Sequence, residues 1–296
     1  FYITDATELA WISSKVNSLD AEVQGKSLYI SKDIDLGNQT FNPIGHAVFG
    51  TTSQNLYVSE SDFRATPRFT GSIFGNGNTI YNVKLRSNSV AGRGLFAHVI
   101  GTGSSVPVVV DGVNIESVLV GGQGKWSGAL IGYVRDVDQI SNCSVTNVAI
   151  GTGSNNALTY ACGAMLGFIS TTKDITINNC FTANIEYGPI AWNSSGFIGK
   201  IISGKKVTIE NCHASEGFCH TFLPVGETMN SMTLYLDKDG YNNSWFIGTL
   251  VKTNGMELII NNVLDNSANW VEQTKNNGTG TDVTADEQTA AYAWPY

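Results

Sequence analysis

Charged residues are scarce in this chain, and basic residues are the scarcer kind. Only 14% of the 296 residues are charged, and 17 Lys and Arg stand against 25 Asp and Glu, which gives a net charge of −8. Nucleic acids and anionic membranes are bound by basic surfaces. We therefore expect neither as a partner of this protein.

Long apolar runs and prolines are also lacking. No stretch approaches the ~18 apolar residues of a membrane-spanning helix, so we expect no membrane insertion of this segment. Proline contributes 6 residues, whereas glycine contributes 32. Glycine and the many asparagines adopt the positive φ angles of tight corners. This composition is typical of a turn-rich all-β protein.

A short motif recurs five times along the chain. A small residue opens an apolar triplet, a glycine-like position follows, and a β-branched run comes next, at residues 94–99, 129–134, 164–169, 196–201 and 244–250. The steps are about 35 residues, with a last step of about 49, which is typical of an array whose units stack on one another. We therefore expect one continuous solenoid.

A second motif follows each of the last four copies, at residues 140–143, 177–180, 209–212 and 260–263. Residues 80–83 look like an earlier copy of it. The runs between the motifs are short and rich in Ile, Val and Thr, without the i, i+3, i+4, i+7 pattern of helices. The sequence therefore predicts one coil of parallel strands per repeat.

Stacked coils place equivalent residues in columns along the axis. Two apolar columns are expected inside, with Leu130, Met165, Phe197 and Phe246 in one and Val134, Ile169, Ile201 and Leu250 in the other. A further column is expected at a corner, where stacked amides can hydrogen-bond to one another, and consists of Asn142, Asn179, Asn211 and Asn262.

Three of the five cysteines form another such column. Cys143, Cys180 and Cys212 occupy equivalent places in successive repeats, and Val263 continues the column. A disulfide framework pairs its cysteines, whereas these align, and their total number is odd. We expect reduced, buried side chains that act as small apolar residues.

Both ends carry helix signals, as expected for a solenoid that must cover its open sheet edges. Asp5 with Glu8 forms a capping-box pattern before an amphipathic stretch, and Thr284 with Glu287 repeats the signal. We expect a cap helix within 1–20, a parallel β solenoid over 21–270, and a C-terminal cap helix and tail over 271–296. Residues 214–243 are expected to form an insertion that explains the long last step.

Residues 69–83, with the sequence FTGSIFGNGNTIYNV, and the step Gly94-Leu95-Phe96 resemble the GLUG-type repeat region of large bacterial surface proteins. Residues 9–10, 16–17, 25–26, 33–36 and 41–45 also resemble that region, whereas Ala97 departs from the last glycine of its "GLFG" step. The resemblance implies a right-handed parallel β-helix in a secreted or outer-membrane-associated protein of gut Bacteroidetes. It implies adhesion and glycan contact, and it carries over no catalytic residues.

Three pairs of aspartates have the i, i+2 spacing that puts two carboxylates on one strand face: Asp33 with Asp35, Asp136 with Asp138, and Asp237 with Asp239. A glycosidase needs two carboxyl groups roughly 5 to 9.5 Å apart. We expect a structural role for the first pair and a solvated turn for the second. Asp237 and Asp239, in the insertion, are the weak catalytic candidates, and they lack the further ligands of a calcium loop.

The densest group of potential metal ligands is Cys212-His213 with Cys219-His220. Adjacent residues on a strand point to opposite faces, so His213 should face away from the interior Cys212. A zinc site would need these side chains to converge. We expect no metal and no cofactor.

Aromatic residues precede the repeated motif at Trp126, Tyr160, Trp192 and Tyr241. In a stacked array they would either line one edge as a ladder whose flat faces bind sugar rings, or cover the corner and pack on one another. His98, Tyr133 and Phe168 share a second, outward column, which we expect to be covered by a neighbouring turn or by another domain.

These features favour a secreted or cell-surface binding and adhesion module. We expect it to contact glycans, or another host or cell-surface ligand, through Trp126, Tyr160, Trp192 and Tyr241. The alternative is a polysaccharide lyase or glycoside hydrolase on the same scaffold, with Asp237 or Asp239 in a groove beside the insertion. A spacer that only presents another domain is the third interpretation. The ligand and the oligomeric state stay open.

Overall fold

The computed structural model describes most of the chain as β-structure. The described residues are 1–45, 67–85, 90–101, 106–120, 124–150, 159–187, 191–203, 205–221, 247–252, 256–261, 264–265 and 270–274. Within these ranges there is one helix, and the strands form four sheets in which neighbours pair in parallel. This arrangement is compatible with a parallel β-helix.

Two of the sheets are long. Sheet A contains β1 (Tyr2–Ile3), β2 (Leu28–Ile30), β5 (Ile73–Phe74), β9 (Val109–Asp111), β13 (Gln139–Ser141), β17 (Ile175–Asn178), β21 (Lys206–Glu210) and β24 (Glu257–Asn261). Sheet B contains β3 (Ile34–Asp35), β4 (Thr40–Phe41), β6 (Thr79–Leu85), β10 (Asn114–Val120), β14 (Ser144–Ile150), β18 (Phe181–Tyr187), β22 (His213–Thr221), β25 (Leu264–Asp265) and β26 (Trp270–Thr274).

The other two sheets are shorter. The recurring small–apolar–glycine motif begins just after a strand of sheet D and continues into the next strand of sheet C. Sheet D contains β7 (Val90–Arg93), β11 (Gly124–Ser127), β15 (Thr159–Gly163) and β19 (Ala191–Ser195). Sheet C contains β8 (Phe96–Ile100), β12 (Ile131–Arg135), β16 (Leu166–Thr171), β20 (Ile198–Ser203) and β23 (Ile247–Lys252).

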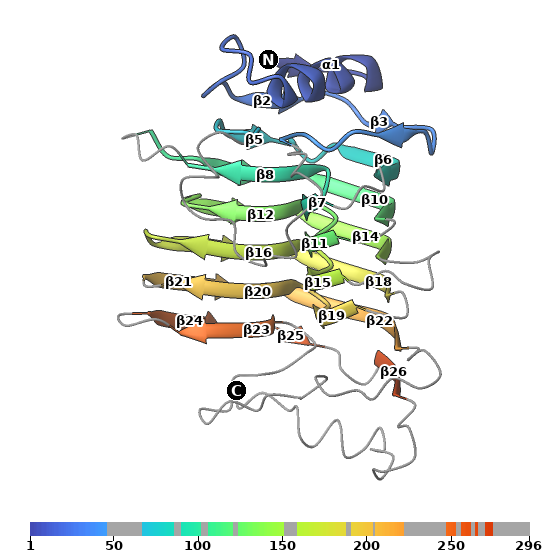
Figure 1. Cartoon of the computed structure of the whole chain (residues 1–296), viewed down its shortest axis with the longest axis vertical. Helices are drawn as coiled ribbons and strands as arrows, with labels where there is room; N and C mark the ends of the chain where they lie inside the picture. The colour runs from blue at the N-terminus through green and yellow to red at the C-terminus, as the bar shows by residue number, and fades with distance from the viewer. Residues whose placement is uncertain are drawn as a thin grey trace.

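The chain visits sheets A, B, D and C in turn and then returns to sheet A. The four strands of one such passage form a rung, and the strands β5–β8, β9–β12, β13–β16 and β17–β20 make four consecutive rungs. Figure 1 shows these rungs stacked one above another, with α1 at the N-terminal end and β24 near the other end. The repeat in the sequence is therefore the rung of the structure.

The predicted interior columns are confirmed where the structure describes them. Val134 pairs with Ile169, Ile169 with Ile201, and Ile201 with Leu250 across sheet C. The first column is also interior, because its described members are all 0% exposed: Leu130, Met165 and Phe197. Phe246 lies outside the described residues.

One predicted equivalence is wrong. Residues 80–83 do not match 140–143, because Ile80 aligns through Ile115 with Val145 of sheet B. The residue equivalent to Ile140 in the first rung is Ile73, which aligns with it through Val110. Both corners of each rung use an Ile- or Val-rich strand next to an asparagine, and the sequence pattern alone does not distinguish them.

Helix α1 (Ala6–Asn17) covers the N-terminal end of the stack (Figure 1). Asp5 is its N-cap and accepts a hydrogen bond from the Glu8 backbone at 2.9 Å, as the capping pattern predicts. The helix buries Leu9, Ile12 and Val16 against the core. The second predicted cap helix lies outside the described residues.

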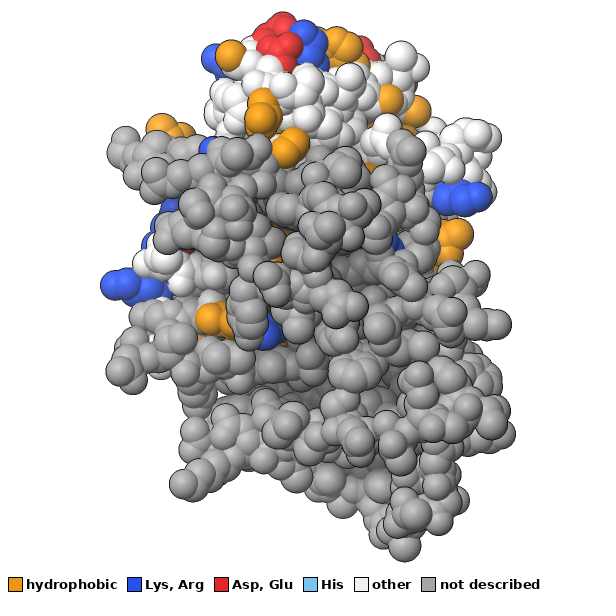
Figure 2. All heavy atoms as spheres, in the orientation of Figure 1, with side chains coloured by type: hydrophobic (Ala, Val, Ile, Leu, Met, Phe, Trp, Pro, Cys, Tyr) orange, Lys and Arg blue, Asp and Glu red, His pale blue; other side chains and the backbone are white. Residues whose placement is uncertain are grey.

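Charged side chains of both signs lie at the C-terminal end of this helix and in the turn that follows it. Lys15 pairs with Asp20 at 2.6 Å and with Glu22 at 3.3 Å. Figure 2 shows acidic and basic side chains side by side at the α1 end. These exposed pairs contribute little to stability, because solvent screens them.

The predicted insertion begins later than residue 214. Residues 214–221 belong to β22, which pairs in register with β18, for example Thr182 with Ala214 and Tyr187 with Cys219. The insertion was inferred from the long last step of the repeat, and that step does not show where the pairing of sheet B ends. The rest of the predicted insertion lies outside the described residues.

Candidate functional site

Sheet D holds the predicted aromatic row, but only part of it is in register. Tyr160 of β15 pairs with Trp192 of β19, so these two residues lie on neighbouring strands at the same level. In the preceding rung the partner of Tyr160 is Lys125, not Trp126. The fourth predicted member, Tyr241, lies outside the described residues. The in-register row is therefore Lys125, Tyr160 and Trp192.

Trp126 occupies a different position, because its backbone turns out of the strand geometry. Its φ is 59°, in the left-handed region, and the equivalent position in the preceding rung is Gly92 with a φ of 76°. A shift of one residue moves a side chain to the other face of a strand. The Trp126 side chain is accordingly 5% exposed, and its ring lies 5.3 Å from Tyr133 and 5.1 Å from Phe168, centroid to centroid. Of the two arrangements expected for the aromatic row, Trp126 therefore does not line an exposed edge: its ring is buried, and it packs on Tyr133 and Phe168, not on another member of the row.

The second aromatic column is confirmed in its register. His98 pairs with Tyr133, and Tyr133 with Phe168, on neighbouring strands of sheet C. All three are buried, and with Trp126 they form a cluster that we call the aromatic seam. Trp126, which packs on Tyr133 and Phe168, comes from strand β11 of sheet D, so a strand of the same chain covers part of this column, where a turn or another domain was expected.

The next residue of that column is Lys200, which pairs with Phe168 and places its Nζ atom 5.8 Å from the Phe168 ring centroid. Burial lowers the pKa of Lys200 and raises that of the Tyr133 phenol. Arg93 of β7 is 1% exposed, and burial lowers its pKa to about 10. Tyr133 and Arg93 are therefore buried polar side chains, whereas Lys200 is half-buried next to the Phe168 ring.

Glycines bring sheets C and D into direct contact. A Cβ atom on Gly132 would lie 2.3 Å from the Arg93 backbone nitrogen, and one on Gly167 would lie 2.5 Å from the Trp126 carbonyl carbon. No side chain fits between the two backbones at these points. The glycine of the recurring motif is thus required by close approach, and it fixes sheet D on sheet C.

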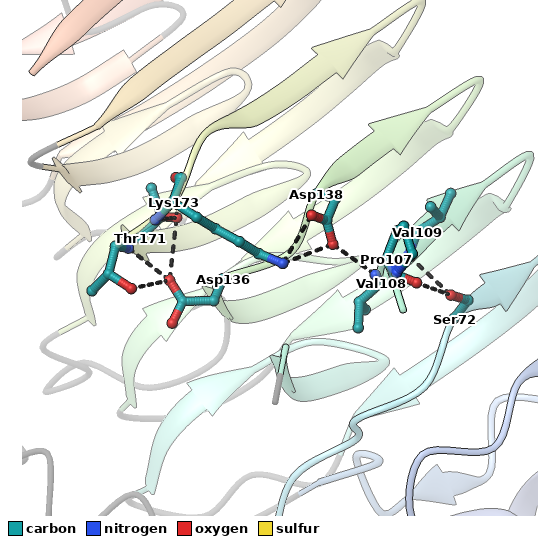
Figure 3. Close-up of polar contacts among 9 residues, drawn as sticks. Ser72, Pro107, Val108, Val109, Asp136, Asp138, Thr171 and Lys173 are labelled. Carbon is teal, nitrogen blue, oxygen red and sulfur yellow. Dashed lines mark hydrogen bonds and ion pairs between the residues drawn. The ribbon is translucent and has the colours of Figure 1, made fainter. Parts of the chain in front are cut away.

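The aspartates at the turns before sheet A serve to join rungs (Figure 3). Asp136 Oδ1 accepts hydrogen bonds from the Thr172 backbone at 2.6 Å and from its hydroxyl at 2.9 Å. Asp138 pairs with the Lys173 ammonium at 2.8 Å and accepts a 2.7 Å bond from the Val108 backbone. The expectation of a simply solvated turn is corrected, because each carboxylate bonds to a neighbouring rung.

The first aspartate pair has the structural role expected of it. Asp33 Oδ1 accepts a 2.8 Å bond from the Thr79 backbone. Asp35 Oδ1 accepts bonds from the Gly37 backbone at 2.7 Å and from Asn82 Nδ2 at 2.8 Å. These contacts hold the first corner of sheet B. The weak catalytic candidates Asp237 and Asp239 lie outside the described residues.

The predicted asparagine column forms hydrogen bonds along the axis. Asn179 Nδ2 donates to Asn142 Oδ1 at 2.7 Å, and Asn142 Nδ2 donates to Asp111 Oδ1 at 2.7 Å. Asn211 instead donates to Asn178, at 3.0 Å. The described part of the column therefore starts on the Asp111 carboxylate and changes partner at Asn211, and the fourth predicted member, Asn262, lies outside the described residues.

A second asparagine ladder was missed. Asn184 Nδ2 donates to Asn147 Oδ1 at 2.6 Å, and Asn147 Nδ2 donates to Glu116 at 3.3 Å. Both asparagines have positive φ and lie in the middle of sheet B. The signal was present in the sequence, because Asn82, Asn147 and Asn184 recur inside apolar runs at the repeat spacing.

A stack of three aromatic rings, one exposed and two half-buried, was also missed. Tyr2, Tyr29 and Phe74 pair in register at the N-terminal end of sheet A, with ring centroids 5.1 Å apart at both steps. Tyr2 is 73% exposed. The long segment between β4 and β5 interrupts the repeat spacing there, so these three residues could not be aligned by periodicity.

Potential metal ligands do not gather at one point in the described part of the chain. There, no group of three His, Cys, Asp or Glu residues is placed to hold an ion together. Cys212 is 1% exposed, whereas the His213 ring contacts the Phe181 ring edge-on at 5.5 Å between centroids, so the two side chains point to opposite faces as expected. The described residues also contain no helix with the length and hydrophobicity of a membrane-spanning segment.

Comparison with known proteins returns no match to a protein-family model, to a curated protein or to a solved structure.

Proposed function

We propose that this protein is a binding or adhesion module, built as a right-handed parallel β-helix, that contacts glycans through sheet D. The observation that carries the proposal is the in-register pairing of Tyr160 with Trp192 on neighbouring strands. The right hand follows from the general preference of crossovers between parallel strands. A secreted or cell-surface location and membership of the GLUG-type surface proteins are part of the same proposal, and the sequence resemblance supports both.

Two aromatic residues at one level of adjacent rungs suit a sugar chain. Neighbouring strands lie about 4.8 Å apart, so Tyr160 and Trp192 put two aromatic residues within a short distance along the stack. Tyr and Trp combine a large apolar surface with a polar tip, which matches the mixed faces of a pyranose ring. Lys125 is the next residue of the row, and lysine is a residue type that donates hydrogen bonds to hydroxyl or carboxylate groups.

A rigid support favours binding by this row. Sheet D rests on sheet C through the glycine contacts at Gly132 and Gly167. A surface that is already held in its bound geometry loses less conformational entropy when a ligand binds. The recurring motif would then serve function indirectly, because it fixes the backbone of the binding row.

The carboxylates favour binding over hydrolysis. Asp33, Asp35, Asp136 and Asp138 all accept hydrogen bonds from the chain itself. The second candidate function, a polysaccharide lyase or glycoside hydrolase, therefore depends on Asp237 and Asp239.

A glycan array followed by a matched variant pair tests the proposal. We expect the wild-type chain to bind a defined set of glycans. The Tyr160→Ala/Trp192→Ala variant should no longer bind those glycans. Tyr2→Ala, which removes an exposed aromatic ring from sheet A, is the control and should bind as the wild type does. An array without hits, or a double variant that binds unchanged, contradicts the proposal.

Release of reducing ends or unsaturated sugars from acidic polysaccharides tests the enzyme alternative. The binding proposal predicts no release by the wild type. Release that Asp237→Asn and Asp239→Asn abolish would establish the alternative instead.

A further inference from the structure

Cys143, Cys180 and Cys212 lie in one interior column at the corner between sheets A and B. Their flanking residues pair in register, Ile140 with Ile177 and Ile177 with Ile209 on one side. Each of the three cysteines is 1% exposed and none is in a disulfide. The column therefore consists of free thiols on consecutive rungs.

The three thiols have the same orientation. Their Sγ atoms lie 3.0, 3.3 and 3.3 Å from the carbonyl oxygens two residues earlier, those of Ser141, Asn178 and Glu210. Each Sγ also lies 3.8–3.9 Å from a carbonyl of the preceding rung, those of Val110, Ile140 and Ile177. Because the contacts repeat, the sulfur atoms are spaced as the strands are, by about 4.8 Å.

We propose that this thiol column is a binding site for a soft cation that takes two sulfur ligands in a line. Bonds between a thiolate and such a metal are about 2.3 Å long, so two of them end to end span about 4.6 Å. This span matches the spacing of neighbouring sulfurs without movement of the backbone. A disulfide requires about 2.05 Å between sulfurs and does not match it.

Charge balance selects the ion. A divalent ion such as Hg²⁺ displaces one proton from each of two thiols and forms two metal–sulfur bonds, so the resulting unit is neutral and two protons leave. A monovalent ion such as Cu⁺ or Ag⁺ leaves one negative charge in an apolar core, which is unfavourable. Thiolates are soft ligands, so hard cations such as Mg²⁺ and Ca²⁺ do not compete.

Cys180 is the shared member of both possible pairs. An ion can lie between Cys143 and Cys180 or between Cys180 and Cys212, whereas Cys143 and Cys212 are two rungs apart. Cys180 is therefore required whichever of the two pairs binds the ion.

The chain offers conservative variants for a test. Val113 occupies the same corner position one rung earlier and is fully buried. Valine in place of a cysteine of the column should therefore fit without disturbing the fold. Cys162 is buried outside the column and pairs with Ser127, so Cys162→Ser is a matched control. A Cys219→Ser background removes the remaining cysteine.

The experiment is titration of these folded chains with Hg²⁺, with sulfur coordination read by X-ray absorption and proton release by pH-stat. We expect one ion with two sulfur ligands and two protons released for the background chain and for Cys162→Ser. Cys143→Val and Cys212→Val should each retain that site, and Cys180→Val should lose it. If Cys180→Val does not fold, Cys143→Val/Cys212→Val removes both pairs and should lose it too.

Two results would overturn the proposal. One is two-sulfur coordination that persists when Cys180 or both of its partners are replaced. The other is coordination by a single sulfur in the folded background chain.

Discussion

At the scale of single residues, left-handed backbone at the corners determines which side chains the fold accepts. Asparagine is the commonest non-glycine residue with positive φ here, at Asn82, Asn142, Asn147, Asn179 and Asn184 among others. Asparagine tolerates this conformation better than most residues, and its amide can bond to the next rung. The same geometry places Trp126 inside the aromatic seam.

Asn179→Ala should destabilise the protein in two ways, through its backbone conformation and through the loss of an amide hydrogen bond. The variant loses the 2.7 Å bond to Asn142 and puts alanine, which tolerates the left-handed region less well than asparagine, at a φ of 52°. We expect the free energy of unfolding in urea to fall by about 2 kcal/mol. Asn179→Gly keeps the conformation and loses only the amide, so about 1 kcal/mol is expected. Equal losses for the two variants would contradict the role of the backbone angle.

The buried phenol of Tyr133 should make the free energy of unfolding decrease at alkaline pH. Burial raises the pKa of its phenol in the folded protein, so the unfolded chain ionises first as the pH increases. Stability from the neutral phenol is complete below the unfolded pKa of about 10 and is lost above it. Denaturant unfolding above that pH should therefore show a smaller decline for Tyr133→Phe than for wild type. The exposed Tyr2→Phe is the control, and an identical decline for Tyr133→Phe and wild type would refute the argument.

At the scale of elements, the contact between sheets C and D depends on glycine. The backbones approach so closely at Gly132 that no methyl group fits. Ordinary sheet packing leaves about 10 Å between backbones for side chains. Sheet D therefore has no independent core and is held by sheet C.

Gly132→Ala should separate the two sheets. Its Cβ would lie 2.3 Å from the Arg93 backbone nitrogen, and backbone cannot rotate away as a side chain can. We expect a loss of more than about 3 kcal/mol in the free energy of unfolding, or failure to fold. Gly37→Ala, with a φ of +61° and no atom within 4 Å of the added Cβ, should cost only about 1 kcal/mol. Similar stabilities for the two variants would show that the close approach does not hold the sheets.

At the scale of the whole molecule, stacking repeats one rung along an axis and keeps equivalent residues in rows. Periodicity alone was sufficient to predict the parallel strands, the interior columns through Val134 and Ile169, and the corner ladder of Asn142 and Asn179. It was not sufficient for sheet D, whose short strands have no pattern of their own. The register of Trp126 could not be predicted because one left-handed residue shifts a side chain to the other face. Tyr2, Tyr29 and Phe74 were missed because a long segment interrupts the period.

The most direct test of the proposed function is calorimetric titration with a glycan selected on the array. A row formed by Tyr160 and Trp192 predicts that Trp192→Ala binds at least about tenfold more weakly than wild type, a loss of about 1.4 kcal/mol. Tyr2→Ala should bind with unchanged affinity. Unchanged affinity for Trp192→Ala, or an equal loss for Tyr2→Ala, would contradict the account.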